Sequence, residues 1–160
     1  MNNDQSQSGG NAETDAQTNR ARYLLSWCED TSIWQAAYDG DISALQGFLD
    51  RGADVNAIAG NEDMTPLMCA LYANKVHAAW FLLERGADVS VRNLYGSTPL
   101  MLASFNGNTD FVRRLIEMGV DINAEAIFAE GETALTKAKR KGHDDIAALL
   151  INAGARHSNA

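Results

Sequence analysis

The stretch Thr98-Pro99-Leu100-Met101-Leu102-Ala103-Ser104-Phe105-Asn106-Gly107, which runs on to Gly119-Val120-Asp121-Ile122-Asn123, decides the fold because its parts recur at fixed distances. Thr65-Pro66-Leu67 lies 33 residues before Thr98-Pro99-Leu100. In both copies a glycine, Gly86 or Gly119, follows the anchor threonine by 21 residues. The chain therefore repeats one unit with a period of 33 residues.

Two further copies flank this pair. The interval of 21 residues also separates Thr31 from Gly52 and Thr133 from Gly154. Four copies thus fill the chain from about Thr31 onward. A period of this length is typical of folds in which similar units stack, and about three copies are needed for a stable stack.

Each copy is predicted to form two antiparallel helices. A threonine at the N-cap, followed by proline, satisfies unpaired backbone amides and presets φ, so a helix begins at each anchor. Apolar pairs at helical spacing, such as Phe111 with Leu115, then mark a second helix that ends at the closing glycine. Between the two helices each copy has a residue type that tolerates a positive φ: Gly40, Asn74, Gly107 or Gly142.

Polar connectors join the copies. The next anchor threonine follows the closing glycine by 13 positions from Gly52 to Thr65, by 12 from Gly86 to Thr98 and by 14 from Gly119 to Thr133. Because a two-helix unit cannot bury its apolar side alone, neighbouring units must stack and share a core. The connectors are then expected to project as fingers along one edge of the stack.

With these features the sequence resembles the ankyrin-repeat family. The resemblance implies an all-α solenoid of stacked helix-turn-helix units with projecting finger loops. It places four repeats at about 31–63, 64–96, 97–131 and 132–157, with the first and last as atypical caps. The segments that carry it are the two Thr-Pro-Leu triplets, Ala36-Ala37, Gly40, Gly107, Gly142-His143, Gly52-Ala53-Asp54-Val55-Asn56 and Gly86-Ala87-Asp88-Val89.

The end repeats depart from the family pattern. Gln35 and Lys137 stand where the middle repeats have Cys69 and Leu102, as expected for terminal repeats that face water. The family also usually has a histidine three residues after the anchor threonine, which bonds to that threonine. Here the position holds Trp34, Met68, Met101 and Thr136, so we expect this side-chain hydrogen bond to be lost and local stability to fall.

Two segments precede the repeats. Residues 1–19 are rich in Asn, Gln, Ser and Gly and lack an apolar core, which predicts a disordered tail and not a signal peptide. Residues 20–30 contain Tyr23, Leu24, Leu25 and Trp27, which we expect to cover the first helix pair as a lid. The alternative is that Trp27 and the tail contact a partner.

The composition of the chain limits the kinds of partner and location that we expect. A chain of 160 residues with 46% apolar content predicts one domain, and a net charge of −8 argues against nucleic-acid binding and favours a basic protein partner. No apolar run approaches the length of a membrane span, so we expect no membrane association. Two cysteines that form no disulfide framework predict a reducing, cytoplasmic location.

No residue pattern indicates catalysis. The three histidines, His77, His143 and His157, are assigned structural roles, and there is no Cys-x-x-Cys pair or phosphate-binding glycine loop. The Asp-Val-Asn and Asp-Ile-Asn segments are expected to begin the fingers and not to bind a metal. We therefore predict a protein that is not an enzyme and that carries no cofactor or metal.

The resemblance implies that partners dock on the inner face made by the first helices and the finger tips. Seven residues after each anchor stand Tyr38, Tyr72, Phe105 and Arg140, residue types that dominate interface energetics. The alternative is that the three aromatic rings pack between adjacent helices. The remaining candidate contacts are Asp39, Asn106 and Lys141 in the next register and, at the finger tips, Met64, Leu94, Tyr95, Phe128 and Glu130, with Ile58, Glu62, Asp63, Ile127 and Glu132 alongside.

Trp80 falls at a register that the family places on the outer face. It is expected to be either a lone exposed aromatic or part of a second contact surface. The chain is predicted to be monomeric, with self-association through the Trp80 face as the alternative.

Three functional hypotheses follow. The first is a module that binds a partner protein through the concave groove of first helices and finger tips. The second is an inhibitor or immunity-type protein whose acidic rim caps a basic enzyme such as a nuclease. The third is an effector or adaptor whose tail makes a separate interaction.

Overall fold

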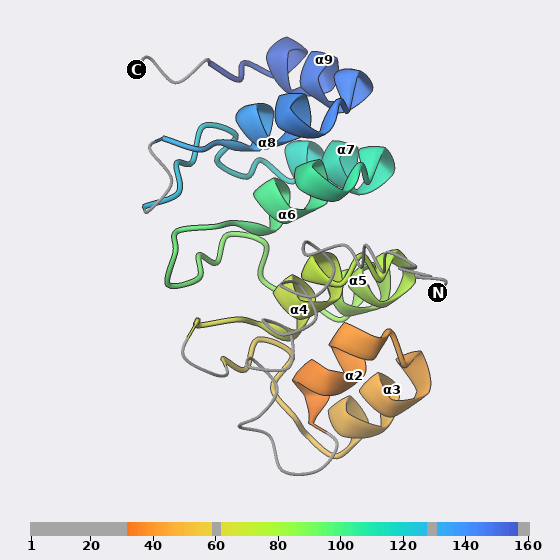
Figure 1. Cartoon of the computed structure of the whole chain (residues 1–160). Coiled ribbons are helices and arrows are strands. Elements are labelled where there is room, and N and C mark those ends of the chain that lie inside the picture. Colours follow the sequence, from red (N-terminus) through yellow and green to blue (C-terminus); the bar gives the residue numbers. More distant parts are fainter. Residues whose placement is uncertain (1–31, 59–61, 128–130, 157–160) are drawn as a thin grey trace, which may run out of the picture.

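The computed structural model describes residues 32–58, 62–127 and 131–156, which form an all-α solenoid of four helix pairs (Figure 1). The predicted tail and lid, residues 1–19 and 20–30, lie outside the described residues. The fingers project along one edge of the stack. The pairs are α2 (Ile33–Asp39) with α3 (Ile42–Asp50), α4 (Pro66–Tyr72) with α5 (Val76–Glu84), α6 (Pro99–Asn106) with α7 (Thr109–Glu117), and α8 (Ala134–Lys141) with α9 (Asp144–Asn152).

A hydroxyl group begins the first helix of every repeat. The side chains of Thr65, Thr98 and Thr133 each accept a hydrogen bond of 3.3 Å from the backbone N–H three residues on, as the sequence predicts. In the first repeat the N-cap is Ser32, which bonds to the Gln35 N–H, and the anchor Thr31 lies outside the described residues. Because the capping signal lies within a few consecutive residues, it can be recognised in the sequence without the tertiary structure.

The turns between the paired helices need a left-handed residue. Gly107 has φ 78°, and the His143 imidazole lies so close that an added Cβ would be 2.7 Å from its Cε1 atom. Asn74 takes the same conformation, with φ 57°, at the one turn that lacks glycine. The predicted ends of the first helices are confirmed at both positions.

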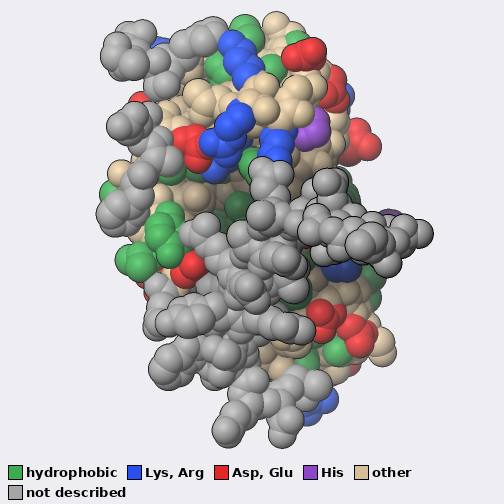
Figure 2. Space-filling view, in the orientation of Figure 1, with side chains coloured by type: hydrophobic (Ala, Val, Ile, Leu, Met, Phe, Trp, Pro, Cys, Tyr) green, Lys and Arg blue, Asp and Glu red, His purple; other side chains and the backbone are tan. Residues whose placement is uncertain are grey.

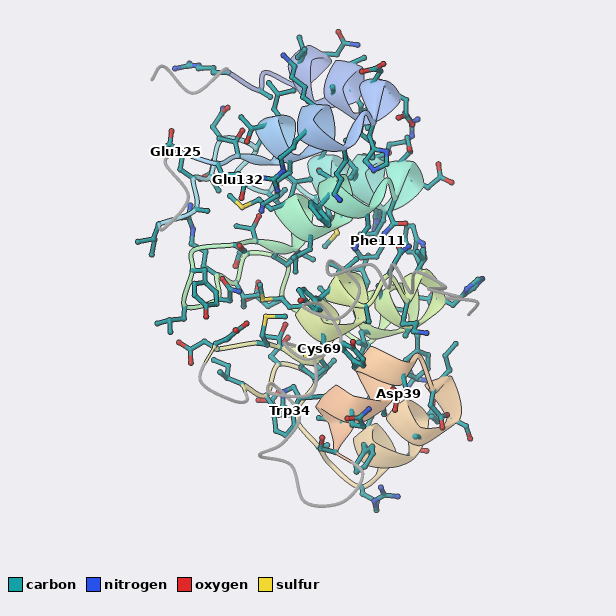
Figure 3. All side chains as sticks on the ribbon, viewed as in Figure 1. Trp34, Asp39, Cys69, Phe111, Glu125 and Glu132 are labelled. Atoms are coloured by element: carbon teal, nitrogen blue, oxygen red, sulfur yellow. The ribbon has the colours of Figure 1, made fainter. Side chains whose placement is uncertain are left out.

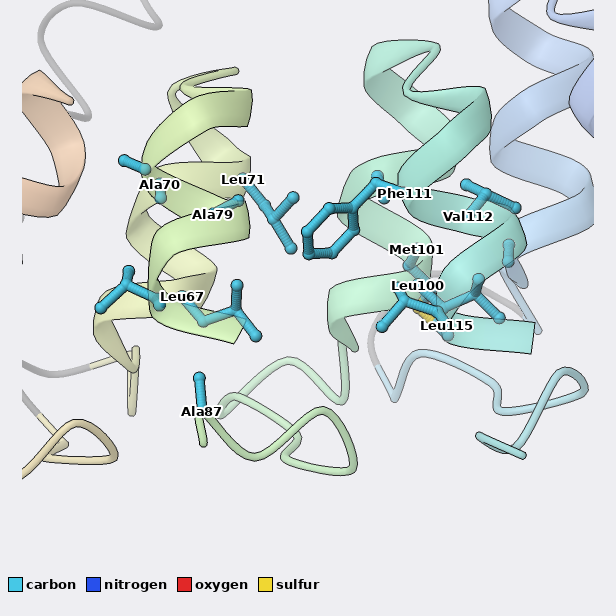
Figure 4. Packing of buried hydrophobic residues seen from close by; sticks show 14 of the residues in the cluster. Leu67, Ala70, Leu71, Ala79, Ala87, Leu100, Met101, Phe111, Val112 and Leu115 are labelled. Carbon is cyan, nitrogen blue, oxygen red and sulfur yellow. The ribbon is translucent and has the colours of Figure 1, made fainter. Parts of the chain in front are cut away.

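The core runs without interruption through all four repeats. Leu67, Leu100 and Leu135 occupy one register and are buried in successive first helices. Figure 4 shows Leu71 of the second repeat pointing toward Phe111 of the third. The repeats therefore depend on one another for burial, as expected for a solenoid.

Backbone hydrogen bonds join the fingers. The Leu94 N–H donates to the Glu62 carbonyl at 3.0 Å, and 33 residues later the Ile127 N–H donates to the Tyr95 carbonyl at 2.8 Å. Farther from the tips, the Asn56 side chain accepts a hydrogen bond from the Asp88 N–H at 2.7 Å. The fingers consequently form one continuous edge and not separate loops.

The fourth repeat exposes a different lysine to water from the one that the sequence predicts. Lys137 does not face water at the end of the stack, because its side chain is only 12% exposed and pairs with Glu132. The exposed polar substitution is Lys139, at the register where Ala37, Leu71 and Ser104 are buried. Register alone could not separate these two lysines, because both stand where the middle repeats have nonpolar or small residues.

The expected loss of the histidine hydrogen bond is wrong for the fourth repeat. The Thr136 hydroxyl accepts a hydrogen bond from the Thr133 N–H at 2.7 Å, which completes a reciprocal cap. In the first repeat the Trp34 indole N–H at the same register donates instead to the Ala57 carbonyl at 3.0 Å. Both residues therefore keep a polar contact at this position.

Trp80 is not an exposed aromatic. It is half-buried against the core, and its ring meets Phe111 of the following repeat edge to face with 4.9 Å between ring centres. The large indole reaches across to the neighbouring repeat, which a register argument within one repeat does not reveal.

Candidate functional site

The four predicted interface residues stand on consecutive first helices. Tyr38 lies on α2, Tyr72 on α4, Phe105 on α6 and Arg140 on α8. The three aromatic side chains are half-buried and Arg140 is exposed. Burial raises the pKa of the Tyr38 hydroxyl above its ordinary value, and the neighbouring Tyr72 raises it further. The aromatic rings therefore both pack between repeats and keep an accessible part.

Phe105 is surrounded by the cations of the next repeat. The Lys141 ammonium lies 4.3 Å from the centre of the Phe105 ring, and Arg140 and Lys137 lie at 5.7 and 5.9 Å. Cations within about 6 Å of an aromatic face are attracted by its quadrupole. In Figure 2 Lys and Arg side chains gather over α8. The first helices carry the predicted interface surface. We call Phe105, Lys137, Arg140 and Lys141 the basic end of this surface.

Glu132 provides the counter-charge for two of these cations. Its carboxylate lies 2.5 Å from the Lys137 ammonium and also pairs with the Arg140 guanidinium. Figure 3 shows Glu132 on the finger side of the stack, with Glu125 near it and Phe111 on the other side. This ion pair was not predicted. Its only sequence signal is an acid one residue before the anchor Thr133 and a lysine four residues after it.

The register next to the aromatic row is used in three different ways. Asp39 is exposed and accepts a hydrogen bond from Gln35 Nε2 at 2.7 Å. The Asn106 amide donates to the Leu71 carbonyl and so joins two repeats. Lys141 is exposed above Phe105. Charge of opposite sign thus stands at the two ends of this register.

The finger tips carry exposed aliphatic side chains. Leu94 is 49% exposed and Ile127, one period later, is 67% exposed, while Ile58 in the first finger is 63% exposed. Tyr95 is half-buried, and its hydroxyl donates to the Glu62 carboxylate at 3.1 Å. In Figure 2 hydrophobic side chains are visible along the finger edge at the left of the view.

One predicted finger contact is turned inward. Met64 is buried, and its sulfur accepts a hydrogen bond of 3.5 Å from the Asn93 amide. Its position directly before the buried anchor Thr65 points the side chain into the stack, so it packs the finger base and is not exposed for contact. Phe128 and Glu130, also predicted at a tip, lie outside the described residues.

The described residues hold neither a candidate metal cluster nor a candidate membrane span. Among them, no cluster of three or more His, Cys, Asp or Glu side chains is placed to hold a metal ion. Nor is any of the helices described here both long and apolar enough to cross a membrane.

Comparisons with known proteins agree on one family of repeats. A family model described as ankyrin repeats (3 copies) matches residues 10–93, 33–126 and 87–159. The chain is 38% identical over 91 residues to Ankyrin repeat and KH domain-containing protein 1 of Homo sapiens, which covers 57% of the chain and 4% of that protein.

Two other relatives match longer parts of the chain. Ankyrin repeat domain-containing protein SAT10 of Stachybotrys chartarum is 32% identical over 124 residues, which is 78% of the chain and 6% of the relative. Alpha-latroinsectotoxin-Lt1a of Latrodectus tredecimguttatus is 36% identical over 115 residues, which is 71% of the chain and 8% of the relative. The chain thus spans less than a tenth of each of these proteins.

Proposed function

Because the chain belongs to the ankyrin-repeat family, whose repeats generally mediate interactions between proteins, we propose that it binds a partner protein on one side of the stack. That side is formed by the first helices α2, α4, α6 and α8 together with the fingers. Ankyrin-repeat domains are typically not enzymes, so binding is the activity proposed for this chain.

The observation that carries this proposal is the pair of aliphatic tips Leu94 and Ile127. Exposing large apolar side chains to water is unfavourable, and an apolar patch on a surface commonly marks an interaction site. The hydrogen bonds from the two tip amides to the preceding finger hold them one period apart on one edge. A partner that covered this edge would bury both side chains without reorganising the backbone.

The aromatic row supports the same side. Tyr38, Tyr72 and Phe105 are half-buried, so their rings are already fixed by packing before a partner binds. Rigid aromatic side chains lose little conformational entropy on binding and are enriched among residues that contribute most to affinity. They provide fixed anchor points beside the apolar finger edge.

The test begins with affinity capture of a partner by the full chain and then compares variants by titration calorimetry. The double variant Leu94→Ser with Ile127→Ser should weaken binding by about 1 to 3 kcal/mol, because it removes two apolar side chains that the partner would bury. The matched control is Met118→Ser with Ile151→Ser, which changes two side chains of comparable exposure (42% and 45%), one at the C-cap of α7 and one on α9. Equal loss in both double variants, or loss only in the control, would refute the proposed side.

A second candidate is the capping of a basic enzyme. Glu62, Asp63 and Glu125 lie along the fingers, and the chain carries a net charge of −8. These charges would attract a basic partner and speed its association at low ionic strength. This candidate predicts an association rate that falls steeply between about 50 and 500 mM salt, whereas a salt-independent rate would contradict it.

A further inference from the structure

We propose that the basic end of this surface takes an acidic segment of the partner protein, with its carboxylates at Lys141 and Arg140. This inference rests on the proposed function, since it names the chemistry bound at one part of the same side. The occupant is a peptide segment of a protein that carries at least two closely spaced Asp or Glu residues. It differs from the basic partner that the net charge alone favours.

The first support is the imbalance of charge around Phe105. Three cations lie within 6 Å of its ring centre, and the ion pairs seen there use the single carboxylate of Glu132. Glu132 contacts Lys137 and Arg140, whereas the contact resolved for Lys141 is with the Phe105 ring. Among the described residues one carboxylate thus stands beside three cations, and a second carboxylate would bring the local charge closer to balance.

The second support is how differently the cations are placed. Lys137 and Glu132 are each only 12% exposed, so their pair belongs to the interior of the fold. Arg140 and Lys141 are exposed on the same helix end. A carboxylate from outside can reach these two without entering the stack, and charge-assisted hydrogen bonds to Arg or Lys are among the stronger polar contacts. The accessible part of Phe105 would pack against the carbon atoms of the same segment.

The third support separates an acidic peptide from a nucleic acid. The cations of the basic end all stand on one short helix, α8, so they could neutralise only a few phosphates, and nucleic-acid affinity depends on many such contacts. The molecule as a whole is acidic, with a net charge of −8, and would repel a long polyanion. A short acidic segment places its charge at the basic end alone and avoids this repulsion.

The experiment is a selection of random 12-residue peptides displayed on phage against the immobilised full chain. Selected peptides should be enriched in Asp and Glu. A fluorescently labelled selected peptide should then bind Lys141→Glu about tenfold more weakly, because attraction is replaced by repulsion, and the loss should shrink in high salt. Arg113→Glu, which makes the same charge change at an exposed position on α7, should alter affinity less than about twofold.

A second variant changes the charge in the opposite sense, so a general loss of stability cannot produce its expected effect on binding. Glu132→Gln frees Arg140 from its partner and should strengthen binding of the same peptide, opposite in sign to Lys141→Glu. Circular dichroism melts of each variant establish that the compared chains are folded.

The outcomes are distinguishable. Enrichment of Lys and Arg, no charge bias, equal losses in Lys141→Glu and Arg113→Glu, or preferential binding of a 20-nucleotide single strand would each overturn the acidic-segment proposal. Selected peptides that lack acidic bias but still lose affinity in the Leu94→Ser, Ile127→Ser double variant would leave the proposed function standing. Peptides affected only by the matched control double variant would overturn both.

Discussion

The Glu132 carboxylate and the Lys137 ammonium lie 2.5 Å apart, and both side chains are only 12% exposed. Lys137 occupies the register of Leu102, so a charged group stands where the preceding repeat has an apolar one. Removing one member of a shielded ion pair leaves the other charge without compensation. The pair therefore makes the fourth repeat depend on a residue of the finger that precedes it.

Glu132→Gln should lower the free energy of unfolding by about 2 kcal/mol, between the usual figures for exposed and for buried pairs. Adding Lys137→Leu should recover most of that loss, because the double variant restores the apolar residue found at Leu102. Urea unfolding followed by circular dichroism measures both. An unchanged midpoint in Glu132→Gln would show that the pair contributes nothing to stability.

Ser104→Ala should raise the free energy of unfolding by about 1 kcal/mol, because a buried hydroxyl without a partner costs desolvation energy. The Ser104 side chain is fully buried on α6, and its hydroxyl has no hydrogen-bond partner among the described residues. Ser32→Ala is the matched control and should lower stability by about 1 kcal/mol, because Ser32 caps α2. A destabilised Ser104→Ala would mean that the hydroxyl is satisfied.

Gly107→Ala should destabilise the protein more than Gly119→Ala. Both glycines have a positive φ, 78° and 76°, so each substitution carries about 1 kcal/mol or more of backbone strain. Only at Gly107 would the new methyl group also meet the His143 imidazole, whereas nothing lies within 4 Å of the corresponding position at Gly119. Equal melting temperatures for the two variants would contradict the close approach of His143.

Thr109→Val should raise the pKa of Asp145. The Thr109 hydroxyl donates a hydrogen bond to this carboxylate and holds its pKa below the ordinary value. A pKa lowered by folding contributes stability above the unfolded pKa, and this contribution is lost as pH falls through the folded pKa. The variant should therefore lose less stability on acidification.

Carbon-13 chemical shifts of the carboxyl groups, followed from pH 2 to 7, measure this change. Asp88 is the internal control, since its lowered pKa depends on Ser90 in a finger and should not respond to Thr109. If Asp145 has the same pKa in Thr109→Val as in the unchanged protein, the hydrogen bond from Thr109 is not what lowers this pKa.

Features set by neighbouring residues could be predicted from the sequence. Thr65, Thr98 and Thr133 cap helices because a cap depends on four consecutive residues, and Asn74 ends α4 because its residue type tolerates the required φ. The period of 33 residues indicates that these units repeat and stack in register, which is enough to predict the solenoid.

Features set by contacts between repeats could not be predicted in the same way. Trp80 is covered by Phe111 of the next repeat, and Met64 turns inward at the base of its finger, although each lies at a register expected to be exposed. The ion pair of Glu132 with Lys137 joins a finger to a helix, and its energy depends on a distance that spacing does not give. The basic end around Phe105 likewise exists only once two repeats stack.

Hydrogen exchange of the full chain, measured by mass spectrometry with and without a captured partner, tests the proposed binding side most directly. The partner should slow exchange at residues 92–97 and 124–127 of the fingers and at the exposed end of α8. Slowed exchange confined to α3, α5, α7 and α9 would contradict the account, because the partner would then occupy the opposite side of the stack.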